Sequence, residues 1–98
     1  MKREEVLQRI RAGQSKLVTF PIKHLAVFGS VARNEAREGS DVDILVEFEP
    51  KAQVGLFEFA RLRRTLAELL DCEVDLVTPE ALRQEMRAQI LQEAVYAA

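Results

Sequence analysis

Hydrophobic residues recur along the chain with two different periods, which predict strands and helices. Apolar and polar residues alternate over residues 41–48, and this is the pattern of a half-buried strand. Over residues 56–70 the apolar residues instead fall three and four positions apart, which predicts an amphipathic helix. The apolar stripe of this helix consists of Phe59, Leu62, Leu66, Leu69 and Leu70.

The predicted strand at residues 41–48 has two unlike faces. Val42, Ile44, Val46 and Phe48 share one face, which we expect to lie in the core. The opposite face carries Asp41, Asp43, Leu45 and Glu47. Because this second face begins with two carboxylates, we expect it to be open there to water, a metal or a ligand.

Weaker patterns predict the elements before this strand. Residues 2–12 carry apolar side chains at helical spacing and end at Gly13, so they predict a short helix. We expect residues 14–22 to be irregular, because Phe20-Pro21 interrupts regular structure. A short apolar run predicts a strand at residues 25–28, and a short helix is expected at residues 30–35.

Two further elements are expected after the long helix. Residues 73–77 predict a third strand, and Thr78-Pro79-Glu80 is a typical helix start, with Thr as the N-cap. We expect this last helix to run close to the C-terminus, with Val95 and Tyr96 on its buried side. Its apolar stripe consists of Leu82, Met86, Ile90 and Ala94.

The order of these elements predicts one α/β (α+β) domain spanning residues 1–98. Its expected architecture is a three-stranded mixed sheet flanked by about four helices, because each sheet face must be covered to bury its apolar residues. The formal net charge of −2 does not favour a protein that coats nucleic acid. The single cysteine fits a reducing cytoplasm, and the sequence shows no apolar run long enough to span a membrane.

Three aspartates are candidates for metal chemistry. Asp41 and Asp43 lie about 7 Å apart along one side of a strand, and such oxygen ligands suit Mg²⁺. Two aspartates at this spacing, with no further motif, are more often simply solvated at the start of a strand. Asp75 lies in a short apolar strand where aspartate is unfavourable, and it reaches the same place if the two strands are neighbours. The alternative for Asp75 is an exposed position on an edge strand.

Gly29-Ser30 is a candidate phosphate-binding turn. A glycine between a strand and a helix lets backbone N–H groups approach a phosphate closely, and Ser30 adds a hydroxyl donor. Arg33 lies one turn later, where it can meet a phosphate or pair with a carboxylate. The competing interpretation of Gly29 is a purely structural turn, and that of Arg33 is a solvated side chain. For Ser40, the competing interpretation is that it caps a turn.

Taken together, these motifs resemble the signature of the DNA polymerase beta-like nucleotidyltransferase superfamily. The resemblance rests on Gly29-Ser30, Ala32-Arg33, Ser40-Asp41-Val42-Asp43 and Val74-Asp75-Leu76-Val77. It is closest to the minimal, MNT-type branch, whose members are usually antitoxins encoded beside a HEPN-domain toxin. One departure is Asn34, where the family commonly has glycine.

The resemblance implies a role for each candidate residue. Asp41 and Asp43 would bind two Mg²⁺ ions, and Asp75 would complete the metal site and act as the base. Gly29 and Ser30, with Arg33 and Ser40, would bind the nucleotide, expected to be ATP. An acceptor hydroxyl, a tyrosine of a HEPN toxin, would attack the α-phosphorus and release pyrophosphate.

Two other functions remain open at this stage. The chain can be a non-catalytic antitoxin that neutralises its partner by occlusion, or a nucleotidyltransferase acting on a small molecule or an RNA end. The predicted core uses the whole sequence, so we expect the acceptor to be presented by a partner protein or by a second copy of this chain.

Overall fold

A mixed β-sheet of four strands forms the centre of the computed structural model, which describes residues 1–37 and 39–97. The strands are β1 (Ile22–Phe28), β2 (Val42–Phe48), β3 (Val74–Val77) and β4 (Val95–Tyr96). Their order across the sheet is β3-β2-β1-β4. Strand β1 is antiparallel to both of its neighbours, whereas β2 and β3 run parallel.

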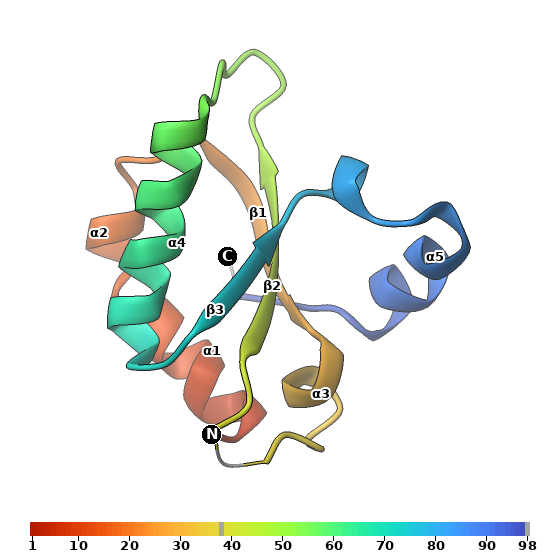
Figure 1. Cartoon of the computed structure of the whole chain (residues 1–98). Helices are drawn as coiled ribbons and strands as arrows, with labels where there is room; N and C mark the ends of the chain where they lie inside the picture. Colours follow the sequence, from red (N-terminus) through yellow and green to blue (C-terminus); the bar gives the residue numbers. More distant parts are fainter. Residues whose placement is uncertain (38, 98) are drawn as a thin grey trace.

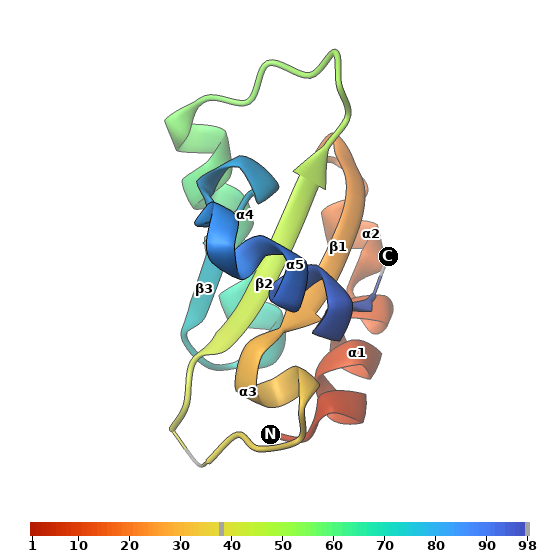
Figure 2. The same ribbon diagram turned by 90° about the vertical axis from the view of Figure 1, so that its right-hand side faces the viewer.

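Helices cover both faces of the sheet (Figure 1). Helices α1 (Arg3–Ala12), α2 (Gln14–Leu17) and α4 (Leu56–Leu70) lie against one face. The 3-10 helix η1 (Pro79–Ala81) and helix α5 (Gln84–Glu93) lie on the other, where α5 crosses in front of β1 and β2 (Figure 2). Helix α3 (Gly29–Ala32) follows directly on β1. No helix within the described residues is long and apolar enough to cross a membrane.

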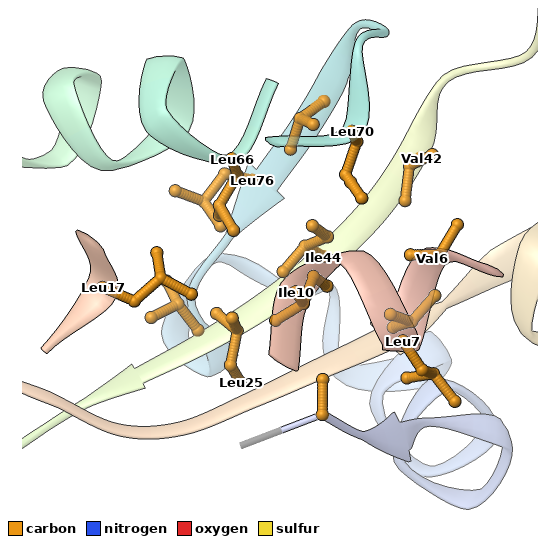
Figure 3. Close-up of a cluster of buried hydrophobic side chains, with 14 of the residues drawn as sticks. Val6, Leu7, Ile10, Leu17, Leu25, Val42, Ile44, Leu66, Leu70 and Leu76 are labelled. Carbon is orange, nitrogen blue, oxygen red and sulfur yellow. The ribbon is translucent and has the colours of Figure 1, made fainter. Parts of the chain in front are cut away.

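The main core lies between the sheet and helices α1, α2 and α4 (Figure 3). The predicted core face of β2 is confirmed there, since Val42, Ile44 and Val46 are almost completely buried and Phe48 packs against them partly buried. Helix α4 also has the predicted bounds. Its fully buried residues are Leu62, Leu66 and Leu70.

A second, smaller cluster lies on the opposite face of the sheet. Ile90 of α5 packs there against Ala26, Phe28 and Leu45. The polar face expected for β2 is therefore only partly open, because α5 covers Leu45 and leaves the end at Asp43 half-buried.

The C-terminal prediction was wrong in two respects. Thr78-Pro79-Glu80 begins only the 3-10 turn η1, and the backbone is extended at Leu82 and Arg83 before α5 starts at Gln84. Helix α5 then ends at Glu93, and Val95–Tyr96 adds the fourth strand to the edge of β1. The edge of β1 offers unpaired backbone groups, and the β-branched and aromatic side chains of Val-Tyr suit a strand.

Two smaller differences follow from tertiary packing. Residues 14–22 are not wholly irregular: they contain α2, and β1 starts three residues earlier than predicted, at Ile22. Phe20-Pro21 does separate the two elements, as expected. In the last helix, Met86 is 47% exposed and only Ile90 is buried, so the predicted four-residue stripe is not a buried face.

Replacing Leu66 with Ala tests the main core. Leu66 is fully buried, so the substitution removes apolar contacts and leaves a cavity, and we expect it to lower the free energy of unfolding by about 2–5 kcal/mol. Leu56→Ala is the matched control on the same helix, because Leu56 is 80% exposed, and it should change stability by less than about 0.5 kcal/mol. Urea denaturation measures both, and equal effects would contradict the assignment of the core.

Candidate active site

The candidate residues meet where β1 ends and where β2 and β3 begin. Because β1 is antiparallel to β2, and β2 is parallel to β3, these three strand ends lie at the same edge of the sheet. The register places Phe28 beside Asp43, and Asp43 beside Asp75. The turn at Gly29 and two of the three aspartates are therefore neighbours, as the sequence predicted.

The aspartates differ in their surroundings. Asp43 is half-buried, whereas Asp75 and Asp41 are exposed. Asp43 and Asp75 are register partners on adjacent strands, so their backbones are about 4.8 Å apart. Asp41 precedes β2 by one residue and lies two positions from Asp43, on the same side of the strand by alternation.

This arrangement changes the acidity of Asp43. Burial raises the pKa of the Asp43 carboxyl above its ordinary value, and the negative charges of Asp75 and Asp41 raise it further. The guanidinium of Arg33 acts in the opposite direction. Asp43 is thus a carboxylate that repels its neighbours and that a nearby cation would stabilise.

Gly29 is required at its position for two independent reasons. Its φ is +73°, in the left-handed region that side chains with a Cβ rarely adopt. A Cβ added at Gly29 would also lie 3.1 Å from Cγ of Asp43 and would overlap with its Oδ2 atom. The turn and the Asp43 carboxylate are therefore in direct contact, with no room for any side chain between them.

The backbone N–H of Gly29 and the side chain of Arg33 already hold an anion. Both donate to the same carboxylate, that of Glu93 at the end of α5. The Gly29 N–H lies 3.1 Å from Oε1, and Arg33 Nη1 lies 3.1 Å from both Oε1 and Oε2. Arg33 Nε also donates to Glu35 at 2.9 Å, and the carboxylates of Glu35 and Glu93 raise the pKa of Arg33.

Sequence reasoning missed Glu93. Its contacts reach residues 60 and 64 positions away, and no local pattern marks it, since Glu93 was expected to be one polar residue on a longer terminal helix. The contact becomes visible only when α5 is placed across the second face of the sheet.

The remaining candidates lie close to the turn. Ser30 is half-buried in α3. The hydroxyl oxygen of Ser40 accepts a hydrogen bond from the N–H of Arg37 at 3.1 Å, which is a turn-capping role. Asn34 has a φ of 57°, so the position where glycine is common does use left-handed backbone, and asparagine accommodates it. Its Oδ1 also accepts from the N–H of Arg3 at 3.2 Å.

Aspartate carboxylates suit a hard divalent cation, but Asp41, Asp43 and Asp75 do not converge on one point in this structure. Within residues 1–37 and 39–97, no three His, Cys, Asp or Glu side chains are arranged to hold a metal ion. Asp43 and Asp75 are adjacent carboxylates whose repulsion an ion such as Mg²⁺ would relieve, and Asp41, one residue before β2, is a further carboxylate on the same side. The two-ion arrangement expected from the sequence stays a prediction.

A glycine turn that binds an anion, set against paired strand carboxylates, is typical of enzymes that transfer a phosphate-containing group. A family model described as "Nucleotidyltransferase domain" matches residues 7–97. The chain belongs to this nucleotidyltransferase family and is an enzyme of that class, which confirms the resemblance seen in the sequence.

Relatives with established folds or names agree with this assignment. The chain is 39% identical over 94 residues to the protein adenylyltransferase MntA of Thermococcus cleftensis, covering 95% of this chain and 93% of that protein. A solved minimal nucleotidyltransferase superposes with a TM-score of 0.79 at 41% identity, covering 97% and 95% of the two chains. A Shewanella oneidensis complex of a tri-AMPylated HEPN toxin with an MNT antitoxin matches in fold alone, with a TM-score of 0.58, 19% identity, and coverage of 90% and 71%.

Substituting Gly29 with Ala tests the contact with Asp43. We expect loss of nucleotide binding and a lower melting temperature, because the new Cβ meets both positive φ and the Asp43 carboxylate. Gly39→Ala is the control, since Gly39 has a φ of +84° and no atom within 4 Å of an added Cβ. Calorimetric titration with Mg-ATP and thermal unfolding measure the two effects, and an equal loss of binding in both variants would contradict the steric argument.

Replacing Asp75 with Asn tests the electrostatics of the pair. We expect the pKa of Asp43 to fall toward its ordinary value, because one of the charges that raise it is removed, whereas burial remains. An NMR titration of the metal-free protein that follows the carboxyl carbon of Asp43 measures this pKa. Asp71→Asn is the control, because Asp71 is not among the charges that act on Asp43.

The same titration predicts a direction for stability. Because the pKa of Asp43 is raised on folding, this group binds more protons in the folded state between its unfolded and folded pKa, so its contribution to stability rises as the pH falls through this window. The Asp75→Asn variant should show a weaker rise. An unchanged Asp43 pKa would show that the two carboxylates do not interact.

Proposed function

We propose that this nucleotidyltransferase transfers AMP from ATP to a tyrosine hydroxyl of a HEPN-domain toxin, and so acts as an antitoxin. The observation that carries the proposal is the contact of the Gly29 turn with Asp43, beside Asp75. The groups that we propose to bind phosphate therefore lie next to those that we propose to bind metal or accept a proton.

The glycine turn would bind the phosphates of ATP. The N–H of Gly29 and the guanidinium of Arg33 already bind one carboxylate together, so they are oriented toward a common anion. The Ser30 hydroxyl, next to Gly29 on the first turn of α3, would add a donor. We also propose that Ser40 contacts the nucleotide. In this structure its hydroxyl caps the loop before β2.

The carboxylates would handle the metal and the proton. Asp41, Asp43 and Asp75 are the oxygen ligands available to hold Mg²⁺. When bound, such ions stabilise negative charge on the attacking and leaving oxygens. Asp75, exposed beside Asp43, would accept the proton of the acceptor hydroxyl as its oxygen attacks the α-phosphorus. The bond from the α-phosphorus to the bridging oxygen then breaks, and pyrophosphate leaves.

The relatives support the choice of acceptor. The Thermococcus cleftensis protein, which this chain matches over nearly its whole length, is named a protein adenylyltransferase. The fold is shared with an MNT antitoxin in complex with an AMPylated HEPN toxin. A toxin of that class is therefore the acceptor we propose, and the cytoplasm is the compartment that fits the free thiol of Cys72.

A second function is favoured by one observation. The anion-binding groups of Gly29 and Arg33 are engaged by the chain's own Glu93, which fits an antitoxin that acts by occlusion without catalysis. The two functions differ in what the aspartates contribute, because an occluding antitoxin needs the fold and not the carboxylates.

Transfer of label from ATP tests the proposal directly. The chain is purified together with a candidate HEPN-domain toxin, sought first in the neighbouring gene, and incubated with α-labelled ATP and Mg²⁺. We expect label on the partner, and a loss of at least about 100-fold in the Asp41→Ala/Asp43→Ala double variant, because the groups that stabilise charge in the transition state are removed. EDTA should abolish transfer by the native protein.

The matched control is Glu68→Ala, which removes an exposed carboxylate on α4, the helix against the opposite face of the sheet (Figure 1), and should leave transfer unchanged. Absence of transfer by the native protein, or equal transfer by the double variant, would contradict catalysis. If the double variant still protects cells from the partner, occlusion is the function.

A further inference from the structure

Glu93 occupies the position where the proposed function requires a phosphate. Its two carboxylate oxygens receive the hydrogen bonds of Gly29 N–H and Arg33 Nη1, all at 3.1 Å. The side chain is only 18% exposed, less than that of Arg33 at 42%, so it is largely shielded from water. Its closest charged partner, Arg33, is the arginine of the predicted nucleotide site.

A carboxylate and a phosphate make the same demands on this site. Both present oxygens with delocalised negative charge, and both accept from a backbone N–H and from a guanidinium in the same way. The two anions cannot use these donors together, because each N–H is directed at one acceptor.

The backbone on either side of Glu93 is fixed. Three residues earlier, Ile90 is buried in the small cluster with Phe28 and Leu45. Two residues later, Val95 pairs with Val27 in the sheet, and the N–H of Ala97 donates to the carbonyl of Leu25 at 2.7 Å. Release of the site therefore needs only rotation of the Glu93 side chain, whose three χ angles allow it without moving α5.

We infer that the Glu93 carboxylate is an internal competitor for the phosphate-binding groups of Gly29 and Arg33, and that the site accepts nucleotide only when this side chain swings away. The inference rests on the proposed function for its biological meaning. Its physical content is a competition between two anions, and this can be measured without catalysis.

The competition predicts the size of the effect. When a site is free for only a fraction of the time, the observed dissociation constant is the intrinsic one divided by that fraction. A carboxylate that occupies the donors for nine-tenths of the time or more thus weakens anion binding about tenfold or more. Binding energy of the incoming nucleotide is spent on displacing Glu93.

The test compares Glu93→Gln with Glu35→Gln. Both substitutions remove one negative charge that contacts Arg33, but only Glu93 also accepts from the N–H of Gly29. Calorimetric titration with inorganic tripolyphosphate, and separately with Mg-ATP, should give a dissociation constant about tenfold lower or better for Glu93→Gln. Glu35→Gln should remain within about threefold of the native protein, because it alters only the bond to Arg33 Nε. It leaves the Gly29 N–H and Arg33 Nη1 bound to Glu93.

A measurement on the native chain keeps the inference testable if the variant folds poorly. Saturating tripolyphosphate should shift the NMR signals of the Glu93 carboxyl carbon and the Gly29 amide together. An unmoved Glu93 signal at saturation, or equal affinities of the Glu93→Gln and Glu35→Gln variants, would overturn it.

The outcomes separate the inference from the proposed function. Tighter anion binding by Glu93→Gln, with no AMP transfer by any form, would support the competitor and refute the enzyme activity. AMP transfer by the native chain, with no gain in affinity in Glu93→Gln, would support the activity and refute the competitor.

Discussion

The alignment of β1, β2 and β3 at one edge of the sheet is the constraint on which the rest of the site depends. The register places Phe28, Asp43 and Asp75 side by side across the three strands. A shift of one residue would turn Asp43 toward the core and move Ile44 out of it. The hydrophobic pattern that fills the core therefore also fixes which way the carboxylate points. Gly29 follows Phe28 with a positive φ, and so keeps the glycine turn in contact with Asp43.

Helix α5 connects stability with function. Its Ile90 closes the smaller apolar cluster over Leu45, which leaves only one end of that sheet face for polar chemistry (Figure 2). One turn later, Glu93 engages the donors at that end. The half-buried Asp43, raised in pKa by burial and by like charges, costs stability in the absence of a cation. The positive charge of Arg33 is shared between this carboxylate and Glu93, so binding at either affects the other.

The sequence allowed prediction of the elements with a strong period and of the site's local motifs. Strand β2 and helix α4 follow from the alternation of apolar residues and from the helical stripe. The family resemblance indicates Gly29, Asp43 and Asp75 individually, whereas the strand register brings them together. Strand β4 has two residues and no period, so it depends on the open edge of β1. The contacts of Glu93 join distant parts of the chain, and the gathering of three carboxylates around metal is not seen in the described residues.

The most direct test of this account is a map of amide shifts by NMR when the protein binds Mg²⁺ and an ATP analogue with an uncleavable α,β-bridge. We expect the largest shifts at the amides of the glycine turn and the strand carboxylates, with the Glu93 amide shifting at the same ligand concentrations. These residues are Gly29, Arg33, Asp43 and Asp75. Shifts confined to the face of the sheet that α1, α2 and α4 cover would contradict this expectation.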